Sequence, residues 1–278
     1  MKRLGLLIVG VLVGALLAPH APSAAGSTPK RMILIVAGQS NASGFNSYAT
    51  DPTTGIDYLA PPYATAADKD DLIAWWQLGL TKDLQATPVP LDTPQIGATS
   101  PPAQIFGPEI GLARAVMAAT RRPVTIVKIA AGGTSLGQWV PGTVIWKNMT
   151  TFVRSIIRFD AAKGQTDVIG GFYWFQGESD AVYPTEADAY RANLTKFVTQ
   201  LRVQLPMASA PIVLAKIWMA LSVVGSNKVR AADNYVAAHE KHVYTVDTKN
   251  LARYDDEVHL TNISQLKLGE EMAKVAMP

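Results

Sequence analysis

Several side chains suited to acyl transfer occur in polar turns of this chain. Ser40 follows a run of apolar residues, within the segment 38–41. Near the C-terminus, Asp256 precedes His259 by three positions, so its carboxylate can reach the imidazole across a tight turn. A hydroxyl nucleophile, an imidazole base and a carboxylate that orients the base are the groups that serine-dependent acyl transfer uses. Taken alone, Ser40 is equally consistent with an ordinary polar turn residue.

The supply of histidines narrows the choice of base. Of the four histidines, His20 lies in an apolar N-terminal segment, whereas His239 and His242 lie at the end of a predicted helix. Only His259 lies in a polar loop beyond the last predicted strand. The segment 239–242 is one residue short of the His-Glu-x-x-His zinc motif. We therefore expect His259 to be the base and expect no metal site.

Two further polar segments follow predicted strands and contain glycine. Residues 132–135 read Gly-Gly-Thr-Ser, and residues 176–180 read Gln-Gly-Glu-Ser-Asp. The second segment contains Glu178, which is another carboxylate candidate. Acyl transfer also needs hydrogen-bond donors for the oxyanion that develops on the substrate. The chain therefore has every chemical group that the reaction requires.

The elements that must position these residues alternate between strands and helices. Apolar runs at 32–37, 124–130, 168–175, 212–217 and 243–246 predict five strands buried on both faces. Helical patterns at about 108–121, 147–162, 186–205, 227–238 and 262–277 fit between or after them. This alternation predicts a parallel sheet covered by helices. Because the carboxyl ends of parallel strands share one edge, we expect the polar segments to converge there.

A long irregular region follows the first predicted strand. It extends to about residue 107 and is dense in proline, glycine, threonine and aspartate. A short apolar piece at 72–80 contains Trp75 and Trp76. An insertion of this length usually shapes a site or a lid. The alternative is a surface excursion that packs on its own tryptophans.

Composition limits the class of protein. Hydrophobic residues make up 48% of the 278 residues and charged residues 17%, which is typical of a globular protein with a substantial core. The chain has no cysteine, so disulfides, thiolate zinc sites and a cysteine nucleophile are excluded. The net charge of +3 gives no reason to expect nucleic acid or an anionic membrane surface as a partner.

The N-terminus has the pattern of a cleaved signal peptide. Lys2 and Arg3 precede an apolar run at 4–18, and small residues lead to Ala25, where we expect cleavage. The alternative is a membrane anchor, but the run is short for a span and prolines follow it. We therefore predict a signal peptide at 1–25 and a secreted or periplasmic protein with no stable membrane association.

Four motifs, in this order, resemble those of the sialate O-acetylesterase branch of the SGNH (GDSL-type) hydrolases, which includes carbohydrate acetylesterases. They are Gly-Gln-Ser-Asn at 38–41, Gly-Gly-Thr-Ser at 132–135, Trp-Phe-Gln-Gly-Glu-Ser-Asp at 174–180 and Asp-Glu-Val-His at 256–259. The resemblance covers the chain from about residue 32 to its end. It implies one catalytic domain at 26–278 with a flavodoxin-like, three-layer α/β/α fold and a mainly parallel sheet of about five strands.

The resemblance also implies an activity and a role for each matching catalytic residue. The activity is serine-dependent hydrolysis of an acetyl ester on a sugar, without a cofactor. Ser40 would be the nucleophile and His259 the general base. Asp256 would orient the base, with Glu178 as a rival or companion in that role.

Binding roles follow from the same resemblance. The backbone N–H groups of Ser40 and Gly133 would donate to the oxyanion. Gln176 would add a side-chain amide, at a place where the wider superfamily usually has an asparagine. Gln39, Asn41 and Trp139 are candidate substrate-binding residues. Packing in the protein interior is the alternative role for Trp139.

We therefore expect a carbohydrate O-acetylesterase whose partner is an acetylated glycan. Sialic acid, xylan and similar glycans all fit this expectation. Two alternatives stay open: a short-chain esterase or lipase of the same fold that acts on non-sugar esters, and a glycan-binding protein that has lost catalysis.

Overall fold

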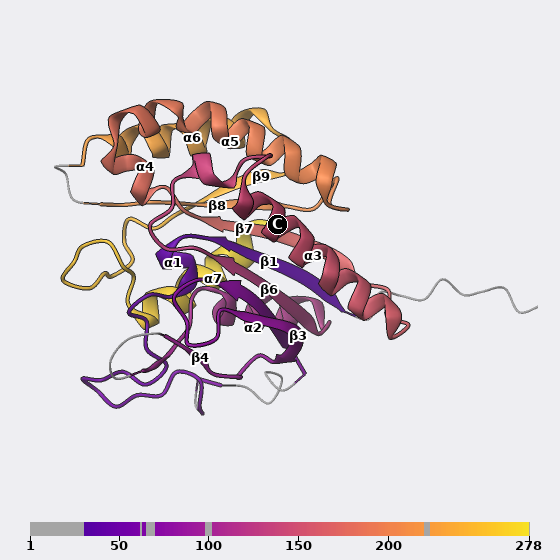
Figure 1. Ribbon diagram of the computed structural model, residues 1–278. Helices are drawn as coiled ribbons and strands as arrows, with labels where there is room; N and C mark the ends of the chain where they lie inside the picture. The colour runs from indigo at the N-terminus through magenta and orange to yellow at the C-terminus, as the bar shows by residue number, and fades with distance from the viewer. Residues whose placement is uncertain (1–30, 62, 65–69, 98–101, 220–222, 278) are drawn as a thin grey trace, which may run out of the picture.

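A seven-stranded sheet organises the fold (Figure 1). The computed structural model describes residues 31–61, 63–64, 70–97, 102–219 and 223–277, so the predicted signal peptide lies outside the described residues. The strand order is β3-β2-β6-β1-β7-β8-β9. The strands are β1 Met32–Gly38, β2 Leu72–Gln77, β3 Leu84–Pro90, β6 Val124–Ala130, β7 Val168–Phe175, β8 Ile212–Lys216 and β9 Val243–Asp247.

The five predicted strands form the parallel centre of this sheet. β1 pairs with β6 on one side and with β7 on the other, and β8 and β9 continue the parallel arrangement. All seven residues of β6 are buried, as are six of the seven in β1. Strands that are covered on both faces need such continuous apolar runs. The α/β fold class predicted from the sequence is therefore confirmed.

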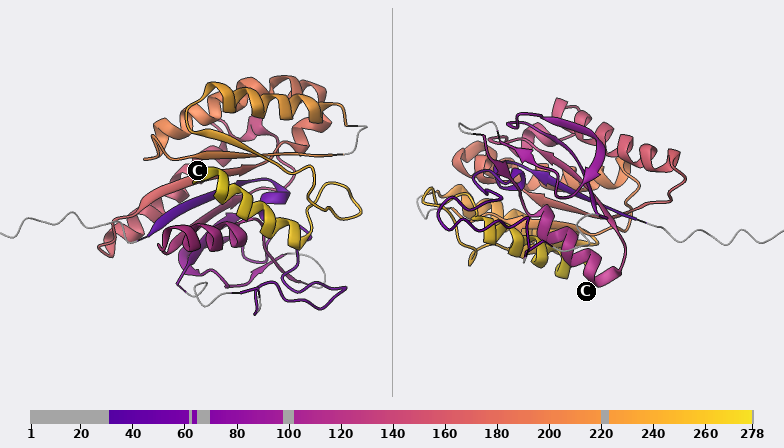
Figure 2. Two further views of the ribbon diagram at one scale, coloured as in Figure 1. Left: turned by 180° about the vertical axis from the view of Figure 1, so that it is seen from behind. Right: turned by 90° about the horizontal axis from the view of Figure 1, so that it is seen from below.

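Helices cover both faces of the sheet. The longer ones are α2 Glu109–Thr120, α3 Val144–Ala162, α5 Pro184–Gln204, α6 Gly225–His239 and α7 Asn262–Ala276. Figure 2 shows α2 and α7 side by side in front of the sheet, whereas α5 and α6 pack together on the opposite face. None of the helices in the described ranges is long and apolar enough to cross a membrane.

The insertion after β1 is more regular than the sequence predicts. Its apolar piece forms β2, which lies parallel to β6, and β3 then pairs antiparallel with β2. A small hairpin of β4 Gln95–Ile96 and β5 Gln104–Ile105 follows. The sheet thus has seven strands instead of about five. The insertion extends the sheet beyond β6 and lies beside the carboxyl end of β1.

Candidate active site

A sharp turn after β1 presents Ser40. Gly38 has φ of +148°, and a Cβ at that position would lie 1.9 Å from the carbonyl oxygen of Phe175. Only glycine therefore fits at the end of this strand. The short helix α1, Ser40–Ser43, begins directly after the turn and ends at Gly44, which is left-handed. Ser40 is consequently at the carboxyl edge of the sheet, as the sequence predicts.

Ser40, His259 and Asp256 form one chain of hydrogen bonds. The Nε2 atom of His259 lies 2.9 Å from the Oγ atom of Ser40, and its Nδ1 atom lies 2.7 Å from Oδ2 of Asp256. An ionised carboxylate only accepts hydrogen bonds, so neutral His259 carries its proton on Nδ1 and leaves Nε2 free to accept from the serine hydroxyl. This is the arrangement in which an imidazole can activate an alcohol.

Asp256 is held as a carboxylate by its own turn. Its Oδ1 atom accepts hydrogen bonds from the backbone N–H groups of Val258 and His259, at 2.9 and 2.8 Å. Burial alone would raise the pKa of Asp256, but the hydrogen bonds from the backbone and imidazole of His259 and from Val258 outweigh it and lower the pKa. Asp256 therefore stays ionised while it contacts His259.

Asn41 ties the turn that carries Ser40 to the loop that carries His259. Its side-chain amide donates to the carbonyl of Val258 at 3.1 Å and accepts from the N–H of Leu260 at 2.9 Å. The same amide nitrogen donates to Glu178 at 2.7 Å. Asn41 is only 1% exposed. The expectation that Asn41 contacts substrate is therefore wrong, because its polar groups are buried and engaged within the protein.

Glu178 lies behind the site, at the start of α4 Glu178–Val182. Its Oε1 atom accepts from Asn41, and its Oε2 atom has no hydrogen-bond partner in the described part of the chain. Burial raises the pKa of Glu178, despite the opposing effects of the Asn41 hydrogen bond and the nearby His259 and Arg253. Of the two candidate acids, Asp256 thus contacts the imidazole and Glu178 contacts Asn41.

The predicted oxyanion donors divide into two groups. Gly133 has φ of +69° in an exposed turn, and a Cβ on its neighbour Gly132 would lie 3.8 Å from Cβ of Ser40. The backbone at this turn is therefore next to Ser40. The amide nitrogen of Gln176, in contrast, donates to the carbonyl of Thr134 and to Asp180. Because both of its N–H groups are used there, Gln176 is not placed to stabilise an oxyanion.

The two other predicted binding residues are also buried. Gln39 reaches the wall of the site, but its side-chain oxygen faces the N–H groups of Gly177 and Ser179, at 3.4 Å. Trp139 is fully buried, and its ring packs edge-on against Trp174 with centroids 5.0 Å apart. The expectation that Trp139 stacks on a sugar is wrong, because the ring has no exposed face.

Phe45 is a site residue that the sequence analysis missed. Its ring is 44% exposed, and its centroid lies 4.7 Å from that of the His259 imidazole. It comes five positions after Ser40, directly beyond Gly44, where α1 ends. An aromatic residue just after the nucleophile turn is the signal that would have identified it.

Two hollows of about 400 Å³ each meet at Ser40 and share Phe45 and Gly132. The first, which we call the histidine hollow, extends over the ends of β7 and β8. Its apolar walls are formed by Val182, Met219 and Val258, and the imidazole of His259 also lines it. The second, which we call the insertion hollow, extends toward β2. Its walls include Asn46, Tyr48, Leu78, Gly97 and Ile105.

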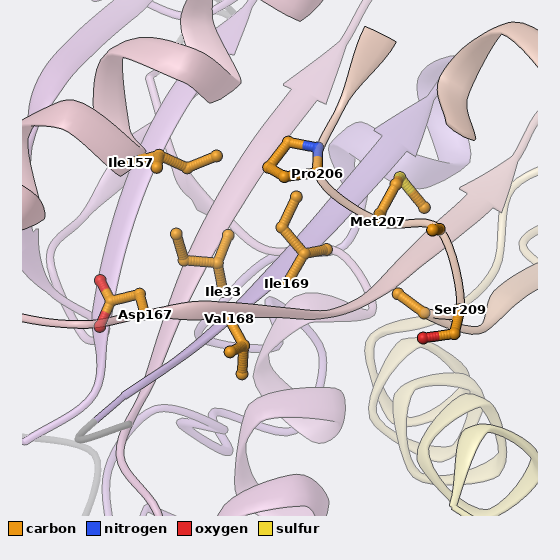
Figure 3. A pocket seen from close by; sticks show the side chains of 10 residues that line it. Ile33, Ile157, Asp167, Val168, Ile169, Pro206, Met207 and Ser209 are labelled. Atoms are coloured by element: carbon orange, nitrogen blue, oxygen red, sulfur yellow. The ribbon is translucent and has the colours of Figure 1, made fainter. Parts of the chain in front are cut away.

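A smaller hollow lies at the opposite edge of the sheet (Figure 3). Its volume is about 270 Å³, and it lies at the amino ends of the strands, where Ile33 and Val168 line it. Asp167 and Ser209 also line it, but no histidine does among the described residues. It therefore lacks the combination of groups found around Ser40. No cluster of three or more metal-ligating side chains occurs within the described ranges.

A fully buried network of charged and polar side chains contacts the last residue of α1. The Nζ atom of Lys128, on β6, donates to the carbonyl of Ser43 at 2.9 Å, to Gln95 at 3.0 Å and to Glu109 at 2.8 Å. Both charged side chains are 0% exposed. Burial lowers the pKa of Lys128, although the adjacent Glu109 opposes the shift. This network connects β6, α2 and the β4–β5 hairpin to the last residue of α1.

Comparison with known proteins identifies related chains over nearly the whole length. Residues 30–278 match the family model described as carbohydrate esterase, sialic acid-specific acetylesterase. A probable carbohydrate esterase of Arabidopsis thaliana is 26% identical over 259 residues, which cover 91% of this chain and 93% of that protein.

Solved structures give the same fold. The structure of that Arabidopsis thaliana protein superposes with a TM-score of 0.67 at 25% identity, over 90% of this chain and 98% of that one. A carbohydrate acetylesterase from Xanthomonas citri has a TM-score of 0.60 at 18% identity, over 88% of this chain and 55% of that one. The protein NanS has a TM-score of 0.63 at 13% identity, over 90% and 98% of the two chains.

Proposed function

This chain belongs to the family of carbohydrate esterases described as sialic acid-specific acetylesterases, and from that premise we propose that it removes O-acetyl groups from a carbohydrate through an acyl-enzyme on Ser40. One observation carries the proposal: the hydrogen-bonded chain from Ser40 through His259 to Asp256, which opens onto two hollows. Nucleophile, base and orienting acid are in contact without any rearrangement.

The reaction proceeds by two acyl transfers. His259 takes the proton of Ser40 as the Oγ atom attacks the acetyl carbonyl, and the backbone N–H groups of Ser40 and Gly133 donate to the oxyanion. His259 then protonates the departing sugar oxygen. In the second half, His259 removes a proton from water, the resulting hydroxide attacks the acetyl carbon, and acetate leaves as Ser40 regains its proton.

The two carboxyl groups have different roles in this proposal. Asp256 fixes the tautomer of His259 and stabilises the imidazolium that forms when the base takes a proton. Glu178 holds Asn41, which in turn holds the backbone on both sides of His259. Asp256 is thus the orienting acid, and Glu178 supports the loop geometry.

Export forms part of the proposal. The basic residues Lys2 and Arg3, the apolar run at 4–18 and the small residues up to Ala25 support cleavage at that point. Mass spectrometry of the protein recovered from outside the cytoplasm should give a mature chain that begins at Gly26. Recovery of the intact N-terminus would contradict cleavage.

Acetate release from a panel of O-acetylated glycans tests the activity. The wild-type protein should release acetate from at least one of them, and Ser40→Ala should release none above the uncatalysed background. Ser209→Ala, which changes a serine in the hollow at the opposite edge, is the matched control and should keep wild-type rates. Full activity in Ser40→Ala would refute the mechanism.

The apolar walls of the histidine hollow favour a second candidate function. Val182, Met219 and Val258 would also accept the acyl part of a short-chain ester that carries no sugar. Rates on p-nitrophenyl esters of two to eight carbons separate the two functions. A decline beyond acetate supports the acetylesterase, whereas a maximum at longer chains supports the short-chain esterase.

A further inference from the structure

The insertion hollow is built almost entirely by the segment between β1 and α2. Asn46 and Tyr48 come from the loop after α1, Leu78 and Gly79 from the end of β2, and Ile105 from β5. Its volume of about 400 Å³ falls within the range of small-molecule sites, roughly 300–1,000 Å³. Since Ser40 and Gly132 form part of its wall, a molecule bound there lies against the nucleophile.

The walls of this hollow combine neutral polar groups with aromatic rings. Asn46 contributes an amide and Tyr48 a hydroxyl, and neither side-chain polar group has a hydrogen-bond partner within the described ranges. The exposed ring of Phe45 adds an apolar face. The residues described as lining the hollow carry no formal charge. Sugar rings are recognised in this way, with hydroxyl groups on polar side chains and C–H faces on aromatic rings.

The histidine hollow offers less for a sugar. Among its polar side chains, Gln39 and Glu178 are buried and face other protein groups, which leaves Ser179 besides Ser40 and His259. Its remaining walls are largely apolar. A sugar there would leave most of its hydroxyl groups without protein partners, which costs binding free energy.

We propose that the insertion hollow binds the sugar unit that carries the ester, and that this sugar is neutral. The assignment rests on the proposed function and specifies its substrate class. The leaving sugar oxygen must come within reach of the Nε2 atom of His259, which is 2.9 Å from Ser40 Oγ. Ser40 and Phe45 line both hollows, and the Phe45 ring adjoins the imidazole, so a sugar in the insertion hollow lies at the wall shared with the hollow that His259 lines.

Three substitutions test the hollow without altering the catalytic groups. Leu78→Trp fills the rim with a large side chain. Tyr48→Phe removes one hydroxyl group, and Asn46→Gly removes the amide. Glycine is the appropriate replacement for Asn46, because its φ of +64° would strain alanine. Val203→Trp, on an exposed face of α5, is the control for the added bulk.

The first measurement is specificity. For each variant, kcat/KM for O-acetylated xylotetraose is divided by kcat/KM for p-nitrophenyl acetate. Leu78→Trp should lower this ratio at least tenfold. Tyr48→Phe and Asn46→Gly should each lower it about two- to tenfold, as expected for the loss of one neutral hydrogen bond. Val203→Trp should keep the wild-type ratio. Unchanged ratios in all three hollow variants would overturn the proposal.

The second measurement is binding, which does not depend on turnover. Calorimetry with Ser40→Ala should detect xylotetraose, and the Ser40→Ala/Leu78→Trp protein should bind it at least tenfold more weakly. If the wild-type protein releases no acetate but this difference in binding holds, the proposed function fails and the sugar site stands. Tighter binding of sialic acid than of xylotetraose, with the same dependence on Leu78, would overturn the assignment to a neutral sugar.

Discussion

Two pairs of titratable side chains lie near α1, and they differ in exposure. In the first pair, the side chains of Asp256 and His259 are 38% and 16% exposed, and His259 contacts Ser40 at the mouth of the site. In the second pair, Lys128 and Glu109 are completely buried, and the Nζ atom of Lys128 donates to the carbonyl of Ser43. In the proposed mechanism, His259 must meet substrate and exchange protons with it. The second pair never meets solvent.

The difference in exposure predicts whether each pair affects the activation free energy of the reaction or the free energy of unfolding. A partly exposed hydrogen-bonded pair contributes little to folding, so in the proposed mechanism the contacts of His259 affect the barrier of the reaction. A buried ion pair is costly to desolvate, but once formed it cannot lose one partner without stranding the other charge. We therefore expect substitutions of His259 or Asp256 to reduce the rate of the reaction. Substitutions of Lys128 or Glu109 should instead reduce the free energy of unfolding. Four experiments test that separation.

Loss of the base should give the largest effect. His259→Ala should lower kcat on an acetyl ester by about 10⁴–10⁶, since no other described residue hydrogen-bonds the Oγ atom of Ser40 and could take its proton. The free energy of unfolding, from urea denaturation, should change by less than about 1 kcal/mol, because the side chain is partly exposed. A large loss of stability in this variant would contradict the expectation that His259 affects the rate and not the stability.

Loss of the buried charge of Lys128 should give the second-largest effect. Lys128→Met strands Glu109 in the interior and should lower the unfolding free energy by about 3–5 kcal/mol, measured by urea denaturation. Lys128→Met/Glu109→Gln removes both charges and should cost less than the sum of the two single changes. Strict additivity would show that the two residues are not coupled.

The two carboxyl groups near the base should differ in their effect on rate. Asp256→Asn should lower kcat by about 10²–10³, because the amide no longer fixes the tautomer of His259. Glu178→Gln should stay within about tenfold of wild type, since burial already favours the neutral carboxyl group. Near-normal activity in Asp256→Asn together with an inactive Glu178→Gln would reverse their assigned roles.

A pH dependence of stability should be the smallest effect. Burial, together with the adjacent carboxyl group of Asp160, raises the pKa of Asp167 to about 7, although the charge of Arg31 opposes the shift. The folded state therefore binds more protons than the unfolded state between about pH 4 and 7, so this group's contribution is complete at low pH and is lost as the pH rises through 7. Asp167→Asn should flatten that part of the curve of unfolding free energy against pH. An unchanged slope would contradict the shift.

The parallel centre of the fold was predictable from the sequence because burial on both faces leaves a continuous apolar run. β6 and β7 have their predicted bounds, and the ends of the strands bring Ser40 to the edge shared by the polar segments. β3 was not predictable. Its sequence contains two prolines and its residues are half-buried or exposed, so neither an apolar run nor a regular alternation marks it.

Contacts between distant residues account for what the sequence did not reveal. Lys128 interrupts an apolar strand, and only its three buried acceptors explain how a cation is tolerated there. Asn41 and Gln176 carry amides of the kind that bind substrates, and both are engaged by partners inside the protein. Residue type predicts which hydrogen bonds a side chain can make, whereas the fold decides which partner it meets.

The hydrogen bonds of Asn41 affect the stage of folding at which the proposed active site is assembled. They join residue 41 to residues 258 and 260, and Gln265 adds a further bond to the backbone of Asn41. Contacts of such long sequence separation form late, because the intervening chain must be ordered first. A ribosome-bound or truncated chain that lacks its last two dozen residues has no base beside its nucleophile. Under the proposed mechanism, the appearance of turnover during refolding should therefore mark the docking of the C-terminal segment.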